Sequence, residues 1–274
     1  MLAAFVGCAG VGKNTVIGRL IAAYPERYEI FPTLTTREMR PGEREGDPYH
    51  YVTKEQFEAL IREGEIYEYE IIHNGNYYGG SKKVLREHLK SGRTLIKDID
   101  VLGARTYKTK LSGITRILSV FLYVEDMNTL LDRMRARGDS EENIQKRAER
   151  FPLEMNLSSD SEYMVNNDRL EDTTDAVNCL LENEVRLGGV YRPCRDCGVP
   201  TEAEIGSSAG TEGKTEPVEL VFNGRELLIA DGAARYVSAM RSGAFIQKKI
   251  KRLTDTSLKP AHISLERWTN MLRA

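Results

Sequence analysis

A glycine-rich segment that begins at Gly7 constrains this chain more than any other feature of its sequence. The segment reads Gly-Cys-Ala-Gly-Val-Gly-Lys-Asn-Thr, follows the apolar run Leu2–Val6 and precedes a helical pattern over Lys13–Ala23. Glycines in such a turn let backbone N–H groups surround an anion, and the N-terminus of the following helix favours negative charge. The strand, turn and helix together predict a phosphate-binding loop, whose lysine reaches the outer phosphates of a nucleotide.

The predicted loop is irregular at one position. The residue after the lysine usually supplies a hydroxyl to Mg²⁺, and here it is Asn14, followed by Thr15. An amide oxygen can ligate Mg²⁺ or hold one of its waters, but Mg²⁺ demands strict octahedral geometry, so we expect the substitution to affect turnover more than binding. The loop residues predicted to bind ATP, with Mg²⁺ carried on the nucleotide, are Gly7, Gly10, Val11, Gly12, Lys13, Asn14 and Thr15.

Strands and helices alternate along the first part of the chain. The segment 31–51 is rich in Thr, Arg, Pro and Gly and is expected to form loops and short strands. Apolar runs predict strands, and apolar residues at helical spacing predict helices. The predicted strands are 94–99, Ile117–Tyr123 and 164–165, and the predicted helices are 54–63, 82–90, 126–137 and 174–184. This alternation is typical of an α/β fold with a parallel sheet and helices on both faces.

The composition changes towards the C-terminus. The stretch 198–217 contains little besides Gly, Ser, Thr, Ala and Glu, which is typical of a flexible linker. The segment 218–229 then alternates around Asn223 and Gly224, a strong signal for a β-hairpin, and we expect a helix near 233–253.

These changes predict three parts: a main domain at 1–187, a linker at 188–217, and a small hairpin-helix appendage at 218–274. From residue 231 onwards there are nine Lys and Arg against three Asp and Glu, although the whole chain has a net charge of −2. The basic excess is therefore confined to the appendage, which indicates a different partner for that part. A chain that ends near Leu187 is expected to fold and function without it.

Further motifs follow the phosphate loop in order. They are Arg37 and Arg40 with Pro-Gly-Glu43, then Tyr49, then Glu68 with Tyr78-Gly79, then Asp98-Ile-Asp100, then Arg133, Arg137 and Arg147, and finally Val165-Asn-Asn-Asp168. In order and spacing they resemble the guanylate kinase family over residues 1–184, apart from one extra residue near Asn74. The resemblance implies a P-loop α/β fold that transfers a phosphoryl group from ATP to GMP or dGMP.

The resemblance assigns the acceptor nucleotide to about residues 32–82. The implied GMP ligands are Thr33, Arg37, Arg40, Tyr49, Glu68, Tyr78, Gly80, Ser81, Asp98 and Asp100. Guanidinium groups pair bidentately with a monophosphate, and a carboxylate such as Glu68 accepts from both N1–H and N2–H₂ of guanine. Asp98 and Asp100 sit at the C-terminal end of a strand, where open α/β sheets bind ligands, and Asp98 is expected to hold Mg²⁺ through water.

The resemblance also implies a lid at about 137–155. Phosphoryl transfer needs in-line positioning and cations around the transferred oxygens, and a closing lid also excludes water. The residues implied for catalysis are Lys13, Arg133, Arg137 and Arg147, and Asn166 and Asp168 are implied as further ATP ligands. No general base is assigned.

The sequence departs from the family pattern at Thr33, Gly80, Lys97 and Leu102. Gly80 lacks the usual small hydroxyl, with Ser81 one place later, and Lys97 stands at a strand position that is normally apolar. These departures leave two alternatives open: a nucleoside-monophosphate kinase with altered base specificity, and a kinase-like binding or scaffold module with weak or no turnover. The intact phosphate loop and the lid arginines favour the enzyme.

The last part of the chain carries two further patterns. Cys194 and Cys197 form half of a zinc-binding pattern, but zinc needs four ligands and no second cysteine pair follows, so a zinc site is not favoured. The basic run 248–252, expected on a helix, is explained best as a solvated face, with contact to nucleic acid or protein as the alternative. Four cysteines, no signal peptide and no membrane-spanning apolar run favour a cytoplasmic protein without membrane contact.

Overall fold

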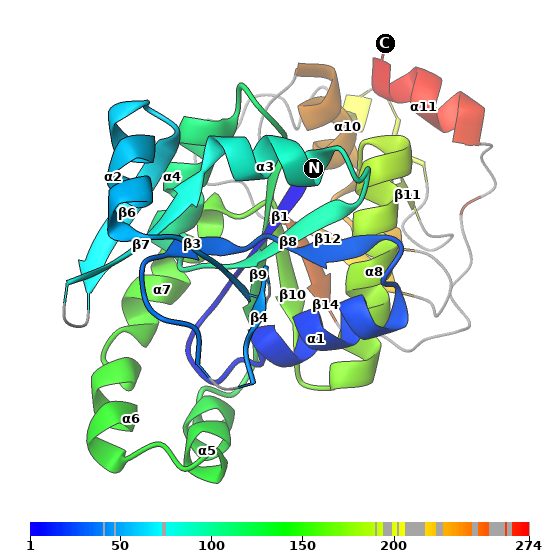
Figure 1. The fold of residues 1–274 in the computed structure, drawn as a ribbon. Coiled ribbons are helices and arrows are strands. Elements are labelled where there is room, and N and C mark those ends of the chain that lie inside the picture. The colour runs from blue at the N-terminus through cyan, green and yellow to red at the C-terminus, as the bar shows by residue number, and fades with distance from the viewer. Residues whose placement is uncertain are drawn as a thin grey trace. The chain divides into compact units, whose positions relative to one another are not determined.

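The computed structural model has two compact units (Figure 1). It describes residues 1–40, 42–46, 48–72, 75–189, 191–193, 199–201, 203–205, 217–222, 227–242, 246–251, 261 and 265–273. The first unit comprises residues 1–6 and 17–118, and the second comprises 7–16 and 119–274. The phosphate loop thus lies in the second unit and the expected acceptor region in the first.

A parallel set of three strands forms the centre of the first unit. Strand β1 (Leu2–Val6) pairs with β8 (Thr94–Asp98), which in turn pairs with β2 (Tyr28–Ile30). Every residue of β1 is buried, which explains its unbroken apolar sequence, because parallel strands are covered on both faces. The predicted bounds of β1 are confirmed.

A second sheet in the first unit carries the acceptor region. Its strands, in spatial order, are β4 (Arg44–Glu45), β5 (Pro48–Tyr51), β3 (Thr33–Thr35), β7 (Asn76–Ser81) and β6 (Ile66–Ile72). Strands β6 and β7 are antiparallel, with Glu68 opposite Gly80 and Glu70 opposite Tyr78. Because side chains alternate along a strand, Glu68 and Glu70 share one face of this sheet.

Three helices of the first unit, α2, α3 and α4, begin at side chains that accept hydrogen bonds from their first turns. Thr53 and Gln56 form a capping box for α2, Ser81 caps α3, and Asp100 caps α4. The helices are α1 (Lys13–Ala23), which starts in the second unit, α2 (Lys54–Arg62), α3 (Lys82–Leu89) and α4 (Val101–Leu111). The predicted bounds of α1 are confirmed, whereas α4 was not predicted.

The second unit has its own mostly parallel set of strands. In spatial order they are β11 (Arg192–Pro193), β13 (Leu227–Asp231), β12 (Val218–Phe222), β14 (Lys248–Lys251), β10 (Tyr163–Asn166) and β9 (Ile117–Tyr123). Among the strands that the structure describes in this unit, β12 and β13 are the antiparallel pair, as the predicted hairpin requires. The hairpin residues Asn223 and Gly224 lie outside the described residues, as does most of the predicted linker.

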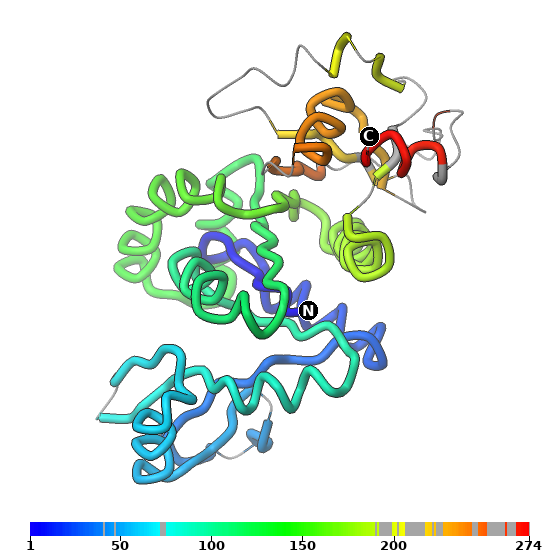
Figure 2. Tube along the Cα trace, turned by 90° about the horizontal axis from the view of Figure 1, so that it is seen from above, coloured from blue at the N-terminus to red at the C-terminus, as the bar shows by residue number. Residues whose placement is uncertain are grey.

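The helices of the second unit lie between and after its strands along the chain. They are α5 (Asn128–Ala136), α6 (Glu141–Ala148), α7 (Phe151–Leu157), α8 (Leu170–Leu187), α10 (Ala233–Ser242) and α11 (Leu265–Arg273), with a short 3₁₀ helix at Ser158–Asp160. Figure 2 shows α10 and α11 side by side, and Arg241 in α10 donates to the carbonyl of Met271 in α11 at 2.9 Å. The expected lid region, at about 137–155, contains α6 and the beginning of α7 and is therefore helical.

The basic run does not form the helix that we expected. Residues Lys248–Lys251 form β14, which pairs in parallel with β10 on one side and with β12 on the other. Its backbone hydrogen bonds are satisfied by two neighbouring strands, and the ammonium groups of Lys248 and Lys249 lie 4.9 and 5.0 Å from the ring centroids of Tyr163 and Tyr123. Through β14 the C-terminal segment continues the sheet that contains β9 and β10.

A buried cluster of polar aromatic side chains fixes this segment to α8 and β10. The hydroxyl of Tyr163 donates to Glu184 and lies 3.0 Å from the hydroxyl of Tyr191. The hydroxyl of Tyr236 accepts from the backbone N–H of Tyr191 at 3.0 Å, and Nε1 of Trp268 donates to the carbonyl of Tyr191 at 2.6 Å. Hydrogen bonds of this kind let polar groups be buried without a large penalty, so the cluster ties the end of the chain to its middle.

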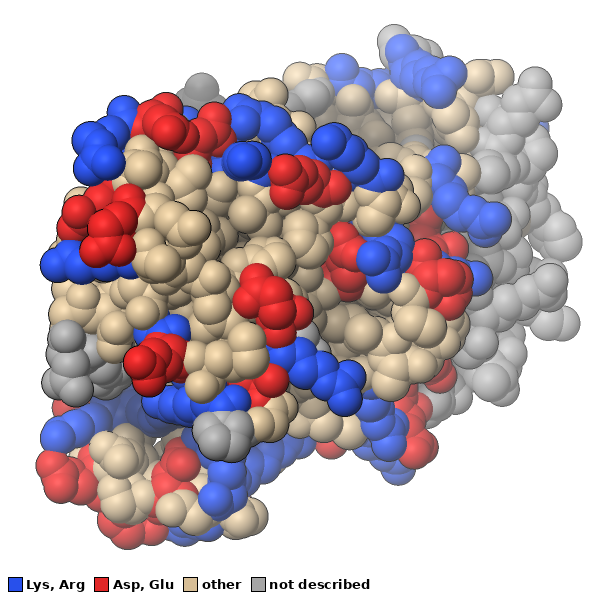
Figure 3. Space-filling view, viewed as in Figure 1, with Lys and Arg blue, Asp and Glu red and all other residues tan. Residues whose placement is uncertain are grey.

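The α/β fold with parallel strands and flanking helices is confirmed. Acidic and basic side chains are interspersed over the face seen in Figure 3, without a field of one sign. Within the described ranges, no helix is long and apolar enough to cross a membrane.

Candidate active site

The phosphate loop of the second unit leaves no room for side chains at its glycines. Gly7 has a φ of 140° and Gly12 a φ of 95°, which L side chains rarely adopt. A Cβ at Gly7 would lie 2.4 Å from the carbonyl oxygen of Leu122, and one at Gly12 would lie 2.7 Å from Nδ2 of Asn167. Only glycine fits the loop at these two positions, and a bare backbone can approach a phosphate closely.

Two side chains hold the carbonyl oxygen of Val11 at the middle of the loop. Nδ2 of Asn167 donates to it at 2.6 Å and Nη1 of Arg133 at 3.3 Å, while Nη2 of Arg133 donates to the carbonyl of Asn167 at 3.0 Å. Arg133, which we expected to act on the phosphates, therefore supports the loop in this conformation. Asn167 was not among the expected site residues, and nothing in the run Asn166–Asp168 distinguishes its role before folding.

The residues expected to hold the nucleotide and its metal begin α1. Nζ of Lys13 donates to the carbonyl of Gly7 at 2.7 Å, so the lysine folds back over the loop. Asn14 and Thr15 are exposed. Their amide and hydroxyl oxygens suit Mg²⁺, which takes one or two protein ligands and completes its octahedron with phosphate oxygens and water. The residues present therefore fit Mg²⁺ carried by a nucleotide.

Asn166 and Asp168, the last two expected ATP ligands, lie at the turn after β10, and one is buried while the other is exposed. Oδ1 of Asn166 accepts from the backbone N–H of Asp168 at 2.8 Å, and its carbonyl accepts from the hydroxyl of Thr173 at 2.9 Å. Asn166 is buried and holds the turn, whereas Asp168 is exposed. Contact of either residue with ATP stays a prediction.

The lid region presents an arginine that is already paired. Nε of Arg137 lies 3.2 Å from Oδ1 of Asp139, and its Nη2 contacts the other carboxylate oxygen. This hydrogen bonding lowers the pKa of Asp139, and the charge of Arg147 adds to the effect. Arg147 is exposed. An anionic ligand at this place would compete with Asp139 for both arginines.

Cys8, the first cysteine of the chain, is not poised to bind metal. Its side chain is buried beside Glu154, and burial together with that acid raises the pKa of the thiol to about 12. Among the residues that the structure describes, no group of three or more His, Cys, Asp or Glu side chains is placed to hold a metal ion. Cys194 and Cys197 lie outside the described residues.

In the first unit, Arg37 is held in place by Glu43. Its two terminal nitrogens donate to the carboxylate at 2.9 and 2.8 Å, and the same carboxylate accepts from the backbone N–H of Arg40 and from the hydroxyl of Tyr51, both at 2.7 Å. The Arg37 hydrogen bond leads the effects that lower the pKa of Glu43 to about 2. Glu43 thus orients Arg37, which keeps further N–H groups for a phosphate because a guanidinium has five.

The expected phosphate cradle gathers around this arginine. The guanidinium carbon of Arg37 lies 5.3 Å from the ring centroid of Tyr49, and the rings of Tyr49 and Tyr78 meet edge to face at 5.9 Å. Arg40 is exposed. The structure thus brings Arg37, Tyr49 and Tyr78 together, and their contact with a phosphate stays a prediction.

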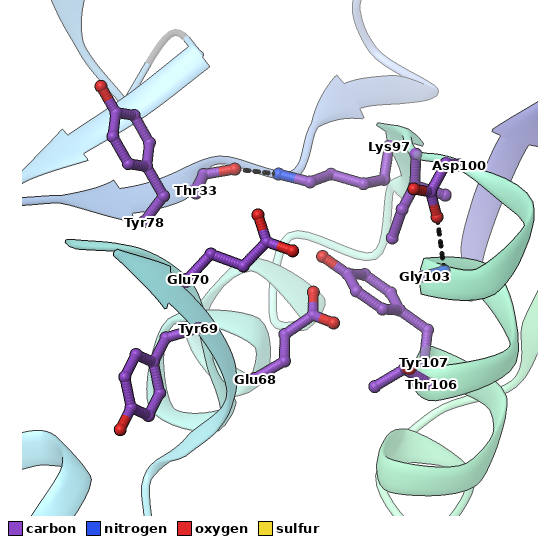
Figure 4. A pocket seen from close by; sticks show the side chains of 12 residues that line it. Thr33, Glu68, Tyr69, Glu70, Tyr78, Lys97, Asp100, Gly103, Thr106 and Tyr107 are labelled. Atoms are coloured by element: carbon purple, nitrogen blue, oxygen red, sulfur yellow. Dashed lines mark hydrogen bonds between the residues drawn. The ribbon is translucent and has the colours of Figure 1, made fainter. Parts of the chain in front are cut away.

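A cavity of about 350 Å³ lies in the first unit (Figure 4). Its lining includes residues from β3, β6, β7, β8 and α4. Four of them were expected from the sequence, namely Thr33, Glu68, Tyr78 and Asp100, and Glu70, Lys97, Thr106 and Tyr107 join them. Figure 4 shows the carboxylates of Glu68 and Glu70 extending towards Tyr107, while Tyr69 points away. Its volume and its mixed lining suit the base of a nucleotide.

Lys97 and Glu68 set the electrostatics of this cavity. Nζ of Lys97 donates to the hydroxyl of Thr33 and, at 3.1 Å, to the carbonyl of Phe31. Burial lowers the pKa of Lys97 to about 8, although the charges of Glu68 and Asp98 oppose the shift. Burial likewise raises the pKa of Glu68, against a hydrogen bond from Tyr107 and the charge of Lys97. In this cavity the charge of Lys97 and the charge of Glu68 each oppose the effect of burial on the pKa of the other group.

Gly80 is glycine because Tyr67 occupies the place of a side chain there. A Cβ at Gly80 would lie 1.9 Å from Cζ of Tyr67 and 2.0 Å from its hydroxyl oxygen. Ser81, which we expected to supply the missing hydroxyl to GMP, is buried, and its Oγ accepts from the backbone N–H of Val84 at 3.3 Å as the cap of α3. The Oγ atom of Ser81 thus caps α3, and contact of its hydroxyl hydrogen with the nucleotide stays a prediction.

The two aspartates after β8 differ in their surroundings. Oδ1 of Asp100 accepts from the backbone N–H of Gly103 at 2.6 Å and caps α4, and Asp100 also lines the cavity. Asp98 is exposed at the end of β8. A role for Asp98 in holding Mg²⁺ through water stays a prediction.

Comparisons with known proteins establish the family of this chain. The sequence profile of the guanylate kinase family matches residues 2–184. The chain belongs to the guanylate kinase family. It is 36% identical over 197 residues to the guanylate kinase of Streptococcus thermophilus strain CNRZ 1066, covering 70% of this chain and 92% of that protein. It is 35% identical over 185 residues to the guanylate kinase of Streptococcus pneumoniae strain R6, covering 67% and 87%.

A solved structure is also similar. The crystal structure of guanylate kinase from Anaplasma phagocytophilum is 24% identical, with a TM-score of 0.48, and covers 67% of this chain and 85% of that chain. The match to the family ends at residue 184, within α8 (Leu170–Leu187), so β11 to β14, α10 and α11 lie outside it.

Proposed function

We propose that this chain transfers the γ-phosphoryl group of ATP to GMP or dGMP. The observation that carries the proposal is the cavity of the first unit, which combines the carboxylate of Glu68 with the hydroxyl of Thr33. Guanine presents N1–H and N2–H₂ donors beside a carbonyl oxygen, so it needs acceptors and a donor side by side. Arg37, Tyr49 and Tyr78 provide a cation and hydroxyl groups for the monophosphate of the same nucleotide.

The phosphate loop is proposed to hold ATP. Glycine backbone at Gly7 and Gly12 receives the phosphates, and Lys13 leaves the carbonyl of Gly7 to contact them. Asn14 and Thr15 would hold Mg²⁺ through their oxygens. Mg²⁺ would neutralise charge on the phosphate oxygens. The residues of the chain position the phosphates and supply cations, with Arg137 leaving Asp139 for the transferred group.

A coupled assay with Mg·ATP and a panel of ribo- and deoxynucleoside monophosphates tests the proposal. GMP or dGMP is expected to have the highest kcat/KM. Glu68→Gln should lower that value by about 30- to 1000-fold, because one acceptor is replaced by a donor in a partly buried site, at about 2–4 kcal/mol. Glu70→Gln is the matched control from the same face of β6, and its loss should be smaller because Glu70 is exposed.

Two outcomes would change the proposal. Preference for AMP, CMP or TMP would mean that the departures at Thr33, Gly80 and Leu102 have altered the base specificity. Tight GMP binding without turnover at any Mg·ATP concentration would favour the binding or scaffold module, for which Asn14 is the main argument.

The remaining expectations rest on less. Contact of the basic C-terminal segment with nucleic acid or protein has an intramolecular alternative, because the ammonium groups of Lys248 and Lys249 lie over tyrosine rings of the same unit. A gel-shift or pull-down with the full chain at physiological salt would test it. A cytoplasmic location is proposed on the sequence features given above, chiefly the small number of cysteines.

A further inference from the structure

Lys97 is a charged residue that the phosphoryl-transfer chemistry itself does not require. It lies in β8, whose preceding residues Leu95 and Ile96 are fully buried, and it pairs across the strands with Ala4 of β1. Its ammonium group reaches into the acceptor cavity and donates to the hydroxyl of Thr33. A lysine that lines a nucleotide-sized cavity needs an explanation in terms of what the cavity binds.

The hydrogen bonds of Lys97 determine the role of Thr33. An ammonium group has three donors and no acceptor, and two of its donors are directed to the carbonyl of Phe31 and to Oγ1 of Thr33. A threonine hydroxyl has one donor and two acceptor lone pairs. Because Lys97 occupies a lone pair, the hydroxyl hydrogen of Thr33 must turn away from the ammonium group. Polarisation by the charged donor strengthens any bond that this hydrogen makes.

The other side of the cavity provides the opposite groups. Glu68 and Glu70 bring carboxylates from β6 (Figure 4), and carboxylates only accept hydrogen bonds when ionised. The cavity therefore presents a fixed donor at Thr33 and acceptors at the two glutamates. A free hydroxyl can serve either a carbonyl or an amino group, whereas one that is held by an ammonium group favours a carbonyl.

We propose that Lys97 is a specificity-determining residue that acts through Thr33, making the cavity select purine monophosphates with an oxygen rather than an amino group at position 6. The inference rests on the proposed function, because it requires the base of the acceptor to occupy this cavity. Lys97 is a positioning residue, since Thr33 makes the contact. The charge of Lys97 also opposes the effect of burial, which raises the pKa of the Glu68 carboxyl.

The test compares GMP with 2,6-diaminopurine riboside 5′-monophosphate, which has an amino group at position 6. Lys97→Met keeps most of the length of the side chain and removes its charge and donors. The ratio of kcat/KM for GMP to that for the 6-amino analogue is expected to fall roughly tenfold, the scale of one hydrogen-bond contact. The ratio of GMP to IMP, which differ only at position 2, should change less than about twofold.

A double-mutant cycle shows whether the effect passes through Thr33. Thr33→Val removes the hydroxyl at nearly constant size and should lower the same ratio by a similar factor. Adding Lys97→Met to Thr33→Val should then change the ratio less than about twofold. Lys110→Met is the control for a lost positive charge in this unit, because Lys110 is exposed on α4, and it should leave all ratios unchanged.

Several results would overturn the inference. An equal loss for both substrates in Lys97→Met would indicate a purely structural role. An unchanged ratio in Thr33→Val would refute the inference even if Lys97→Met did not fold. Independent, additive effects would show that Lys97 does not act through Thr33. If the wild type used no 6-oxopurine monophosphate at all, the proposed function itself would fail, which is a distinguishable outcome.

Discussion

Replacement of Trp268 tests whether the C-terminal segment is an integral part of the second unit. The side chain is fully buried, its Nε1 donates to the carbonyl of Tyr191 at 2.6 Å, and its ring stacks on Tyr236 at an interplanar angle of 12°. Tyr191 and Tyr236 in turn bond to each other and, through Tyr163, to Glu184 in α8. Trp268→Ala should therefore destabilise residues that are far from it in sequence.

The magnitude follows from the packing. Truncation of a buried tryptophan to alanine costs about 3–5 kcal/mol, because the loss of buried area and the cavity both contribute. For a unit of this size each kcal/mol lowers the midpoint of thermal unfolding by about 2–4 °C, so the expected shift is roughly 6–20 °C. Trp268→Phe keeps most of the ring but leaves the carbonyl of Tyr191 without its donor, and should cost about 1–3 kcal/mol.

The single tryptophan of the chain gives a specific assay. Its fluorescence reports only on the C-terminal segment, whereas far-UV circular dichroism reports on all helices and strands. In the wild type, the fluorescence change of Trp268 should coincide with a transition in circular dichroism and with the loss of GMP-dependent ATP consumption. The two variants are compared by circular dichroism and by activity, since they lack the fluorophore.

Two results would refute this reasoning. A fluorescence transition well below the temperature at which structure and activity are lost would show that the segment unfolds by itself. An unchanged midpoint for Trp268→Ala would show that the buried cluster contributes nothing. In either case a chain that ends near Leu187 should be stable and active, as the sequence had led us to expect. Otherwise that truncation should be insoluble or markedly destabilised, because it removes β14 and β12 beside β10.

Three other predictions concern the two nucleotide sites. Lys13→Ala should lower kcat by about 10²–10³-fold while calorimetry shows unchanged GMP affinity, because the lysine belongs to the donor site; unchanged turnover would remove the loop from the mechanism. Gly80→Ser should lower the unfolding temperature, because its Cβ would overlap the ring of Tyr67. Adding Tyr67→Leu should restore the temperature, and an unchanged temperature for Gly80→Ser alone would contradict the overlap. The pKa of Glu43 is lowered to about 2 from a usual 4.5, so the stability from its pairing with Arg37 is fully present above about pH 4.5 and is lost as the pH falls through 2. An NMR titration of the Glu43 carboxyl carbon with a midpoint near 4.5 would contradict the pairing.

Much of the candidate site was predictable because its signals are local. The phosphate loop is one uninterrupted segment in which the apolar strand, the glycines and the helix are adjacent, and the bounds of β1 and α1 agree with the pattern. The acceptor residues Arg37, Glu68 and Tyr78 were identified through motifs whose order the family shares.

Other site residues were beyond the reach of sequence patterns. Glu70 shares a face with Glu68 because side chains alternate along a strand, but the strand β6 itself and its place beside the cavity were not predicted. Tyr107 enters it from α4, a helix we did not predict because Gly103 and two threonines weaken its helical propensity. Asn167 holds the phosphate loop across 156 residues of sequence, a contact that no local pattern contains.

The sequence by itself determined the phosphate loop, the α/β class and the family, and it supplied the candidate residues for the two nucleotides. Only the tertiary structure decided that the basic run Lys248–Lys251 is a strand, that Gly80 is glycine because of Tyr67, and that Lys97 is joined to Thr33. Helical periodicity and glycine-rich turns act between neighbouring residues, so a sequence displays them directly. Strand pairing and side-chain contacts join residues that are distant in sequence, and their free energy exists only after the chain has brought these residues together.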